Sequence, residues 1–283
     1  MNEQELKALV SLLDDPDTEI YQVLEEQLIT CGPDVVPFLE TSWEQSFNAL
    51  LQERIEQIIH KIQFNEVKND LQLWSMSNQD NLLEGLLIIN RYQYPNLNEM
   101  EVHNKLAELR RQAWYQMMYD MSPIEKVKLL NNILFREFGL SGNTADFHAA
   151  QNSFIHKVLE TKKGNPISLA CIYILVAQGL DIPIYGVNLP KHFVLAYMNE
   201  KQPEEVLFYI NVFSRGQIMH SNDIHAFLQQ LHLPPTAGFT KPCSNQHIIV
   251  RILRNLLAAY EQIDNLEKRK DIQLLLDLIA QVP

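Results

Sequence analysis

Apolar residues recur every three or four positions along the first part of the chain, which is the spacing of amphipathic helices. Leu6, Leu9 and Leu13 share one face of the first segment, and Pro16 interrupts the pattern before it resumes. The spacing predicts helices over residues 3–13, 18–30, 35–43 and 50–62. Paired in sequence, these segments resemble two HEAT-like helical hairpins, which bury their apolar faces only against neighbouring helices.

Helices are also predicted farther along the chain, where cap residues support the apolar spacing. Ser122, Pro123 and Glu125 form a strong helix start, with an N-cap serine, a first-turn proline and a glutamate three residues after the cap. Apolar spacing adds helices over residues 80–90, 99–118, 221–231 and 268–282, and Ser244 caps one more. We expect the helix after Ser244 and the last helix to form a hairpin that covers the core.

The central stretch, residues 152–199, combines a buried helix with strand-like runs. Asn165 is a good N-cap, and Pro166 suits the first helical position because its missing N–H would be unpaired there anyway. The residues that follow are apolar on nearly every side until Gly179 ends the run, which predicts a helix buried in a core. Strands are predicted over residues 184–188, 192–198 and 206–213, as a small antiparallel sheet against this helix. The sequence therefore predicts an α+β, predominantly helical fold.

Several separate motifs in the second part of the chain resemble one protein family. The chain reads NSFIHKVLETKKGNPISL, then GVNLPKHFVLAY, then INVFSRG. These segments are similar to the patterns NSFLxxVLxxRxGxPISL, GVxxPGHFL and DPFxxG of the transglutaminase-core-like family of the bacterial SirB type. The resemblance extends over roughly residues 100 to 283, because the segment SNQHIIVRILRNLLAAY is similar to the tetratricopeptide-like tail of that family.

The resemblance implies a transglutaminase/papain-like core whose catalytic positions are altered. In such folds a cysteine at a helix N-terminus is the nucleophile, and a strand-borne histidine assists it. By the motif match, Pro166 occupies the place of the cysteine, His192 matches the catalytic histidine, and Asn211 stands where the acid would be. Proline is not a nucleophile, and asparagine orients a histidine without supplying a full negative charge. His192 and Asn211 are therefore interpreted as vestigial catalytic residues.

These patterns divide the chain into three predicted regions. Residues 1–98 form the HEAT-like helical region, and residues 99–240 form the transglutaminase-like core. Residues 241–283 form the C-terminal helical, repeat-like hairpin.

Two functions of different class are consistent with the sequence. The first is a non-catalytic binding or regulatory module that holds a protein or peptide partner through Asn165, Ser168, His192 and Asn211. The alternative is a cysteine-type hydrolase or acyltransferase in which His192 serves a displaced nucleophile, Cys171 or Ser168. Both residues of the second hypothesis also have a structural explanation. Cys171 lies in an apolar run, as a buried core residue would, and Ser168 suits the first turn of a helix.

Composition narrows the range of partners. A formal net charge of −12 and a pI near 5.2 argue against nucleic acid and anionic membrane surfaces, which attract clustered Lys and Arg. The N-terminal residues lack the features of a signal peptide, and no run approaches the roughly twenty apolar residues of a membrane span. We therefore expect a soluble, cytoplasmic protein.

Cofactor and metal motifs are missing from the sequence. The three cysteines are far apart and do not form a disulfide framework. No phosphate-binding loop or dinucleotide fingerprint occurs, and His220, His225 and His232 lack a metal-ligand spacing. We therefore expect neither a metal nor a cofactor.

Overall fold

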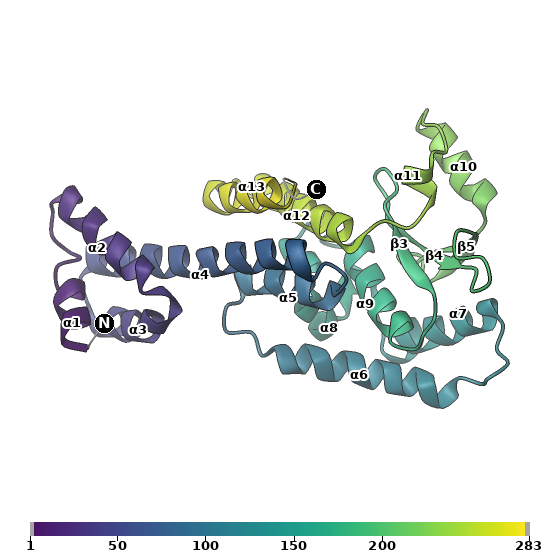
Figure 1. Ribbon diagram of the computed structural model, residues 1–283, viewed down its shortest axis with the longest axis horizontal. Helices are drawn as coiled ribbons and strands as arrows, with labels where there is room; N and C mark the ends of the chain where they lie inside the picture. Colours follow the sequence, from purple (N-terminus) through teal and green to yellow (C-terminus); the bar gives the residue numbers. More distant parts are fainter. Residues whose placement is uncertain (1–2, 281–283) are drawn as a thin grey trace. The chain divides into compact units, whose positions relative to one another are not determined.

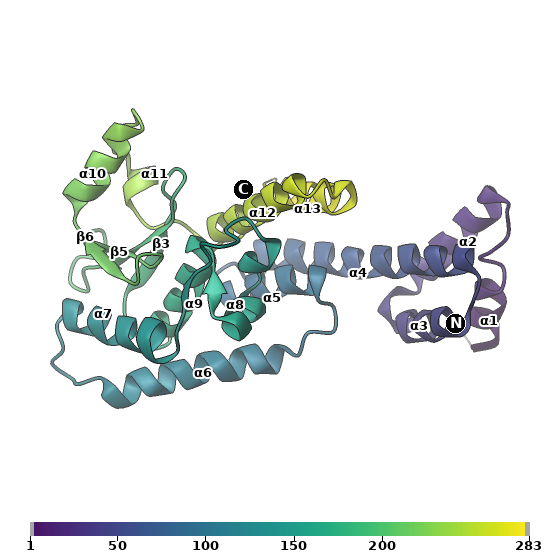
Figure 2. The same ribbon diagram turned by 180° about the vertical axis from the view of Figure 1, so that it is seen from behind.

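The computed structural model of the protein describes residues 3–280 and divides after Asp70 into two compact units. Figures 1 and 2 show the helices and strands from opposite sides. The first unit contains α1 (Glu3–Val10), α2 (Thr18–Thr30), the 3-10 turn Gly32–Val35, α3 (Val36–Gln45) and the beginning of α4 (Ala49–Ser77).

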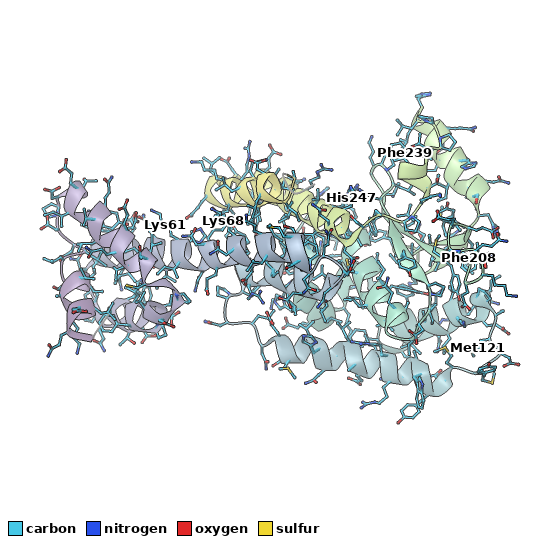
Figure 3. All side chains as sticks on the ribbon, in the orientation of Figure 1. Lys61, Lys68, Met121, Phe208, Phe239 and His247 are labelled. Atoms are coloured by element: carbon cyan, nitrogen blue, oxygen red, sulfur yellow. The ribbon has the colours of Figure 1, made fainter. Side chains whose placement is uncertain are left out.

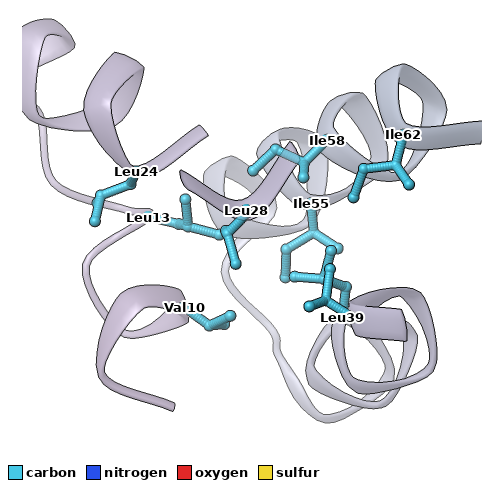
Figure 4. Close-up of a cluster of buried hydrophobic side chains, with 9 residues drawn as sticks. Val10, Leu13, Leu24, Leu28, Leu39, Ile55, Ile58 and Ile62 are labelled. Atoms are coloured by element: carbon cyan, nitrogen blue, oxygen red, sulfur yellow. The ribbon is translucent and has the colours of Figure 1, made fainter. Parts of the chain in front are cut away.

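The first unit has a core of its own, made of aliphatic side chains (Figure 4). Leu28 of α2, Leu39 of α3 and Ile58 of α4 are fully buried in it. Asp17 starts α2 by accepting a hydrogen bond from the Glu19 amide at 2.8 Å, which satisfies one of the free N–H groups at a helix start. All the helices predicted here are present, and their likeness to HEAT repeats stays a prediction.

The second unit begins within α4 and is mostly helical. Its helices before the sheet are α5 (Leu82–Gln93), α6 (Glu99–Gln116), α7 (Pro123–Asn131), α8 (Ile155–Thr161) and α9 (Pro166–Gln178). After the sheet come α10 (Ser221–Gln230), α11 (Ala237–Thr240), α12 (Asn245–Gln262) and α13 (Leu266–Ala280). As predicted, α12 and α13 pack together as a hairpin, and residues 281–282 of the expected last helix lie outside the described residues.

A four-stranded antiparallel sheet follows α9 in the order β3 (Ile184–Val187), β4 (Val194–Met198), β5 (Val206–Asn211) and β6 (Gln217–Met219). The first three strands are the predicted ones, and β6 is an addition. Alternate side chains point to opposite faces of the sheet. Val194, Ala196 and Tyr209 pack against α10. Tyr197 and Phe208 lie on the opposite face, with ring centroids 5.1 Å apart; Phe208 is labelled in Figure 3.

Helix α9 is the central element of the second unit, and it contacts the sheet, α6, α8 and α12. Its residues from Ile167 to Ile174 are all buried, because neighbours cover it on every side as the continuous apolar run predicts. Two short strands, β1 (Ser141–Gly142) and β2 (Lys163–Gly164), pair in parallel just before its start.

The two compact units divide after Asp70, and the predicted domain boundary near residue 98 stays a prediction. Helix α5 is buried on nearly all sides and contacts α8, α9 and α12 of the second unit. Trp74, near the end of α4, also lies there, against Gly85. The division after Asp70 therefore follows the packing of α5, which helical spacing alone does not specify.

Candidate functional site

A cavity of about 190 Å³ opens at the N-terminus of α9. Apolar side chains, cations and amides share its wall, and no aspartate or glutamate is among the lining residues. The lining residues are Phe147, His148, Ala149, Ser153, Asn165, Pro166, Ile167, Lys191, Phe193, Arg251, Asn255 and Ala258.

The N-terminus of α9 is held by a capping box. Asn165 Oδ1 accepts from the Ser168 amide at 3.0 Å, and Ser168 Oγ accepts from the Asn165 amide at 3.1 Å. Asn165 Nδ2 also donates to Ser153 Oγ at 3.0 Å, which ties the helix start to the 3-10 turn Ala150–Ser153. Pro166 is the first helical residue and lines the cavity. Because these polar groups form hydrogen bonds with one another, the rim of the cavity at Asn165 and Pro166 is fixed before any ligand binds.

Two cations give the cavity a positive wall. Arg251 of α12 is half-buried, and its Nη1 donates to Asn188 Oδ1 at 3.0 Å and to the Leu189 carbonyl at 3.4 Å. Burial, and then the neighbouring Arg254, lowers the pKa of the Arg251 guanidinium below its ordinary value. Lys191 lies in the loop between β3 and β4 with a φ of +61°. In the part of the chain that the structure describes, neither Lys191 nor Arg251 forms an ion pair, so the wall can receive an acidic group.

His192 and Asn211 are not among the residues that line this cavity. The His192 ring is exposed and lies edge-on to Phe227 of α10, with centroids 4.8 Å apart. Asn211 Oδ1 accepts from the Ser214 amide at 3.2 Å and closes the turn after β5. Asn211 is two residues after Tyr209 in β5 and therefore lies on the same face of the sheet, the face that packs against α10. The structure therefore brings Asn165, Pro166 and Ser168 together but not His192 or Asn211.

The two displaced nucleophiles considered from the sequence are both enclosed. Cys171 is fully buried, and this burial raises the pKa of its thiol well above the usual range. Ser168 is 2% exposed, and its Oγ donates to the Asn165 carbonyl at 3.2 Å in addition to its capping role. Neither Cys171 nor Ser168 is among the residues that line the cavity.

Sequence reasoning missed Lys191, Phe193 and Arg251 as site residues. A signal existed for Lys191, because the family pattern GVxxPGHFL has glycine where this chain has lysine, and the backbone there is left-handed. Phe193 matches the phenylalanine of the same family pattern, whereas Arg251 left no local signal, since it reaches the cavity from α12 only in the folded chain.

No group of three or more His, Cys, Asp or Glu side chains within residues 3–280 is placed to hold a metal ion. Over the same range, no helix has both the length and the apolar character needed to cross a membrane.

In a comparison with known protein families, residues 100–254 match the family model of the transglutaminase-like superfamily. The chain is 29% identical over 198 residues to a UPF0162 protein of Xylella fastidiosa strain Temecula1, covering 66% of this chain and 67% of that protein. A UPF0162 protein of Vibrio cholerae is 26% identical over 147 residues, covering 52% of this chain and 53% of that protein. The F-box only protein 21 of Mus musculus is 28% identical over 133 residues, which is 46% of this chain and 21% of that protein.

No solved structure matches the chain. The matched segments span about half to two thirds of the length of these bacterial relatives.

Proposed function

Because the chain belongs to the transglutaminase-like superfamily, we propose that it is a non-catalytic member of the SirB type whose α9 cavity binds a peptide or protein segment. The observation that carries the proposal is Pro166, which lines the cavity at the position that the motif match gives to the nucleophile. Proline has no nucleophilic side chain and no amide N–H to stabilise an oxyanion. The cavity thus keeps groups for binding without a nucleophile.

The lining residues favour a segment with an acidic residue beside an apolar one. Lys191 and Arg251 attract a carboxylate, while Phe147, Phe193 and Ile167 offer an apolar wall. A cavity of about 190 Å³ admits a side chain and not a whole helix. We therefore expect a short extended segment to insert one residue at the start of α9.

Binding is tested by selecting acidic peptides from a random display library against the full chain and measuring their dissociation constants by fluorescence anisotropy. We expect Arg251→Gln to weaken binding about tenfold, which corresponds to one charge-assisted hydrogen bond. Ala258→Trp should also weaken it, because the indole fills the cavity. Arg254→Gln is the matched control, since Arg254 is an exposed arginine on the same helix that does not line the cavity. Selected peptides that bind both cavity variants as tightly as the wild type would place the site elsewhere.

The alternative hypothesis, a cysteine-type hydrolase or acyltransferase, is tested by measuring the reactivity of the cysteine thiols. Rates of iodoacetamide labelling are measured for each cysteine by mass spectrometry, in the wild type and in His192→Ala. We expect Cys171 to stay unlabelled in the folded protein, because the thiolate is the reactive form and burial disfavours it. Rapid labelling of Cys171 near neutral pH that is lost in His192→Ala would support a cysteine-type hydrolase or acyltransferase instead.

A further inference from the structure

A second cavity, of about 470 Å³, lies between α7, the π-helix Asn132–Glu137 and the turn that joins β5 to β6. It is separate from the α9 cavity and shares no lining residue with it. Half of its lining residues are cations, and they come from all three segments. The lining residues are Lys128, Asn131, Asn132, Phe135, Arg136 and Arg215.

The cations of this cavity are not neutralised by salt bridges within residues 3–280, although Glu125, three residues before Lys128 on α7, interacts with Lys128 electrostatically. None of them forms an ion pair, whereas Lys126, on the same helix as Lys128, pairs with Glu200 at 3.1 Å. Glu137 follows Arg136 in sequence, but its Oε1 accepts from Asn132 Nδ2 at 2.6 Å and it does not line the cavity. In a chain with a net charge of −12, three cations around one cavity without a carboxylate form a local positive potential that favours an anion.

The turn that carries Arg215 is fixed against the helix. Asn131 Nδ2 donates to the Gly216 carbonyl at 2.9 Å, and Asn131 Oδ1 accepts from the buried Tyr173 hydroxyl at 3.1 Å. Gly216 has a φ of +77°, and a Cβ atom there would lie 1.9 Å from Asn131 Oδ1, so only glycine allows this approach. Arg215 itself has a φ of +54°, a conformation that is uncommon for residues other than glycine and concentrates at functional sites.

The helical wall of the cavity is also unusual. Residues Asn132–Glu137 form a π-helix directly after α7, and the Phe138 amide donates to the Ile133 carbonyl at 2.8 Å. Such wide turns are rare and are often found at functional sites. This one supplies Asn132, Phe135 and Arg136 to the cavity.

We propose that this second cavity binds the phosphate group of a small phosphorylated molecule. Two guanidinium groups and an ammonium suit a doubly charged tetrahedral oxyanion, because each arginine can offer a pair of parallel N–H donors. The cavity is larger than a phosphate ion requires, and Phe135 gives an organic group a contact surface. The proposal does not depend on peptide binding at α9.

The proposal is tested by isothermal titration calorimetry of the full chain with inorganic phosphate and with phenyl phosphate, at constant ionic strength set by sodium chloride. We expect both ligands to bind and phenyl phosphate to bind more tightly. Arg136→Gln and Arg215→Gly should each weaken binding about tenfold, as expected for loss of a charge-assisted hydrogen bond. Glycine at position 215 keeps the left-handed backbone, so that variant removes the charge without disturbing the turn.

Lys126→Gln is the control, because it removes one positive charge from α7 outside the cavity. Its affinity should match that of the wild type, and thermal melting should show all three variants folded. Equal affinity for the two ligands would assign the site to free phosphate, whereas tighter binding of the ester assigns it to a phosphorylated molecule. The proposal is overturned if neither ligand binds below about 10 mM, or if Lys126→Gln weakens binding as much as the cavity variants do.

Discussion

Two tyrosine hydroxyls in the core of the second unit have opposite surroundings. The Tyr173 hydroxyl donates to Asn131 Oδ1 at 3.1 Å and lies 3.4 Å from the Val127 carbonyl. The Tyr197 hydroxyl is buried and has no hydrogen-bond partner among the described residues. Burial raises the pKa of both hydroxyls, that of Tyr197 to about 12. A buried hydroxyl without a partner lowers stability, because it has lost its hydrogen bonds to water.

We predict that Tyr197→Phe leaves the free energy of unfolding unchanged or raises it by about 1 kcal/mol, since the substitution removes an unsatisfied polar atom. Tyr173→Phe should lower the free energy of unfolding by about 1 to 2 kcal/mol, because it breaks the bond to Asn131 and leaves that amide oxygen short of a donor. Urea denaturation measures both values. Both side chains are fully buried, so the two variants are matched controls for each other. A clear loss of stability in Tyr197→Phe would contradict this account.

His156 of α8 is held in its neutral form. Its Nδ1 lies 2.5 Å from Asn90 Oδ1, and its ring lies edge-on to Tyr94 with centroids 4.3 Å apart. Burial, and then the neighbouring positive charge of Lys157, lowers the pKa of His156 from 6.5 to about 4. The negative charge of Glu160 raises the pKa of His156, but it offsets only part of this decrease. Protonation of the ring therefore favours the unfolded chain.

The lowered pKa predicts an acid-sensitive stability. Above pH 6.5 the ring is neutral in both states, and as the pH falls from 6.5 toward 4 only the unfolded state takes up the proton. We expect this to reduce the free energy of unfolding by about 1 to 2 kcal/mol, a value discounted because the ring is only half-buried. Urea melts at pH 7 and pH 5 measure the loss, and His156→Gln should reduce it. The exposed His103 provides the control, because His103→Gln should keep the wild-type dependence.

At the scale of elements, helices with local start signals were predictable from the sequence. Asn165 and Pro166 mark the beginning of α9, and Ser122 and Glu125 mark the beginning of α7. In both helices the N-cap residue forms hydrogen bonds with a residue three positions later in the sequence. The strands β3, β4 and β5 were found for a similar reason, since their apolar runs are short and bounded by turns. These features depend on neighbours in sequence.

Features that depend on distant segments were not predictable. The β1–β2 pair joins segments more than twenty residues apart, and the π-helix Asn132–Glu137 reads as ordinary helix in its apolar spacing. The position of His192 near a strand start was foreseen, but its direction toward Phe227 depends on the sheet register and on α10. Arg251 joins the α9 cavity only because α12 packs there. Motif order thus predicted where α9 begins, but not which side chains from other elements reach the cavity there.

At the scale of the whole molecule, the two units differ in the size of their cores. The first unit is about 70 residues long and buries a small aliphatic cluster, which limits its stability. The second unit surrounds α9 with helices and the sheet, and this helix is buried on all sides. Amides in regions with fewer buried contacts open more often to solvent.

We therefore predict that amide hydrogens of α2 and α3 exchange with deuterium faster than those of α9, measured by mass spectrometry on the full chain. Leu28→Ala removes a fully buried side chain from the first core and should destabilise it by about 2 to 5 kcal/mol. Exchange should then accelerate in α2 and α3 while α9 keeps its protection. Ile172→Ala, at a fully buried position of α9, is the converse variant and should accelerate exchange in the second unit alone. Equal acceleration of α2 and α9 by either substitution would mean that the two cores unfold as one.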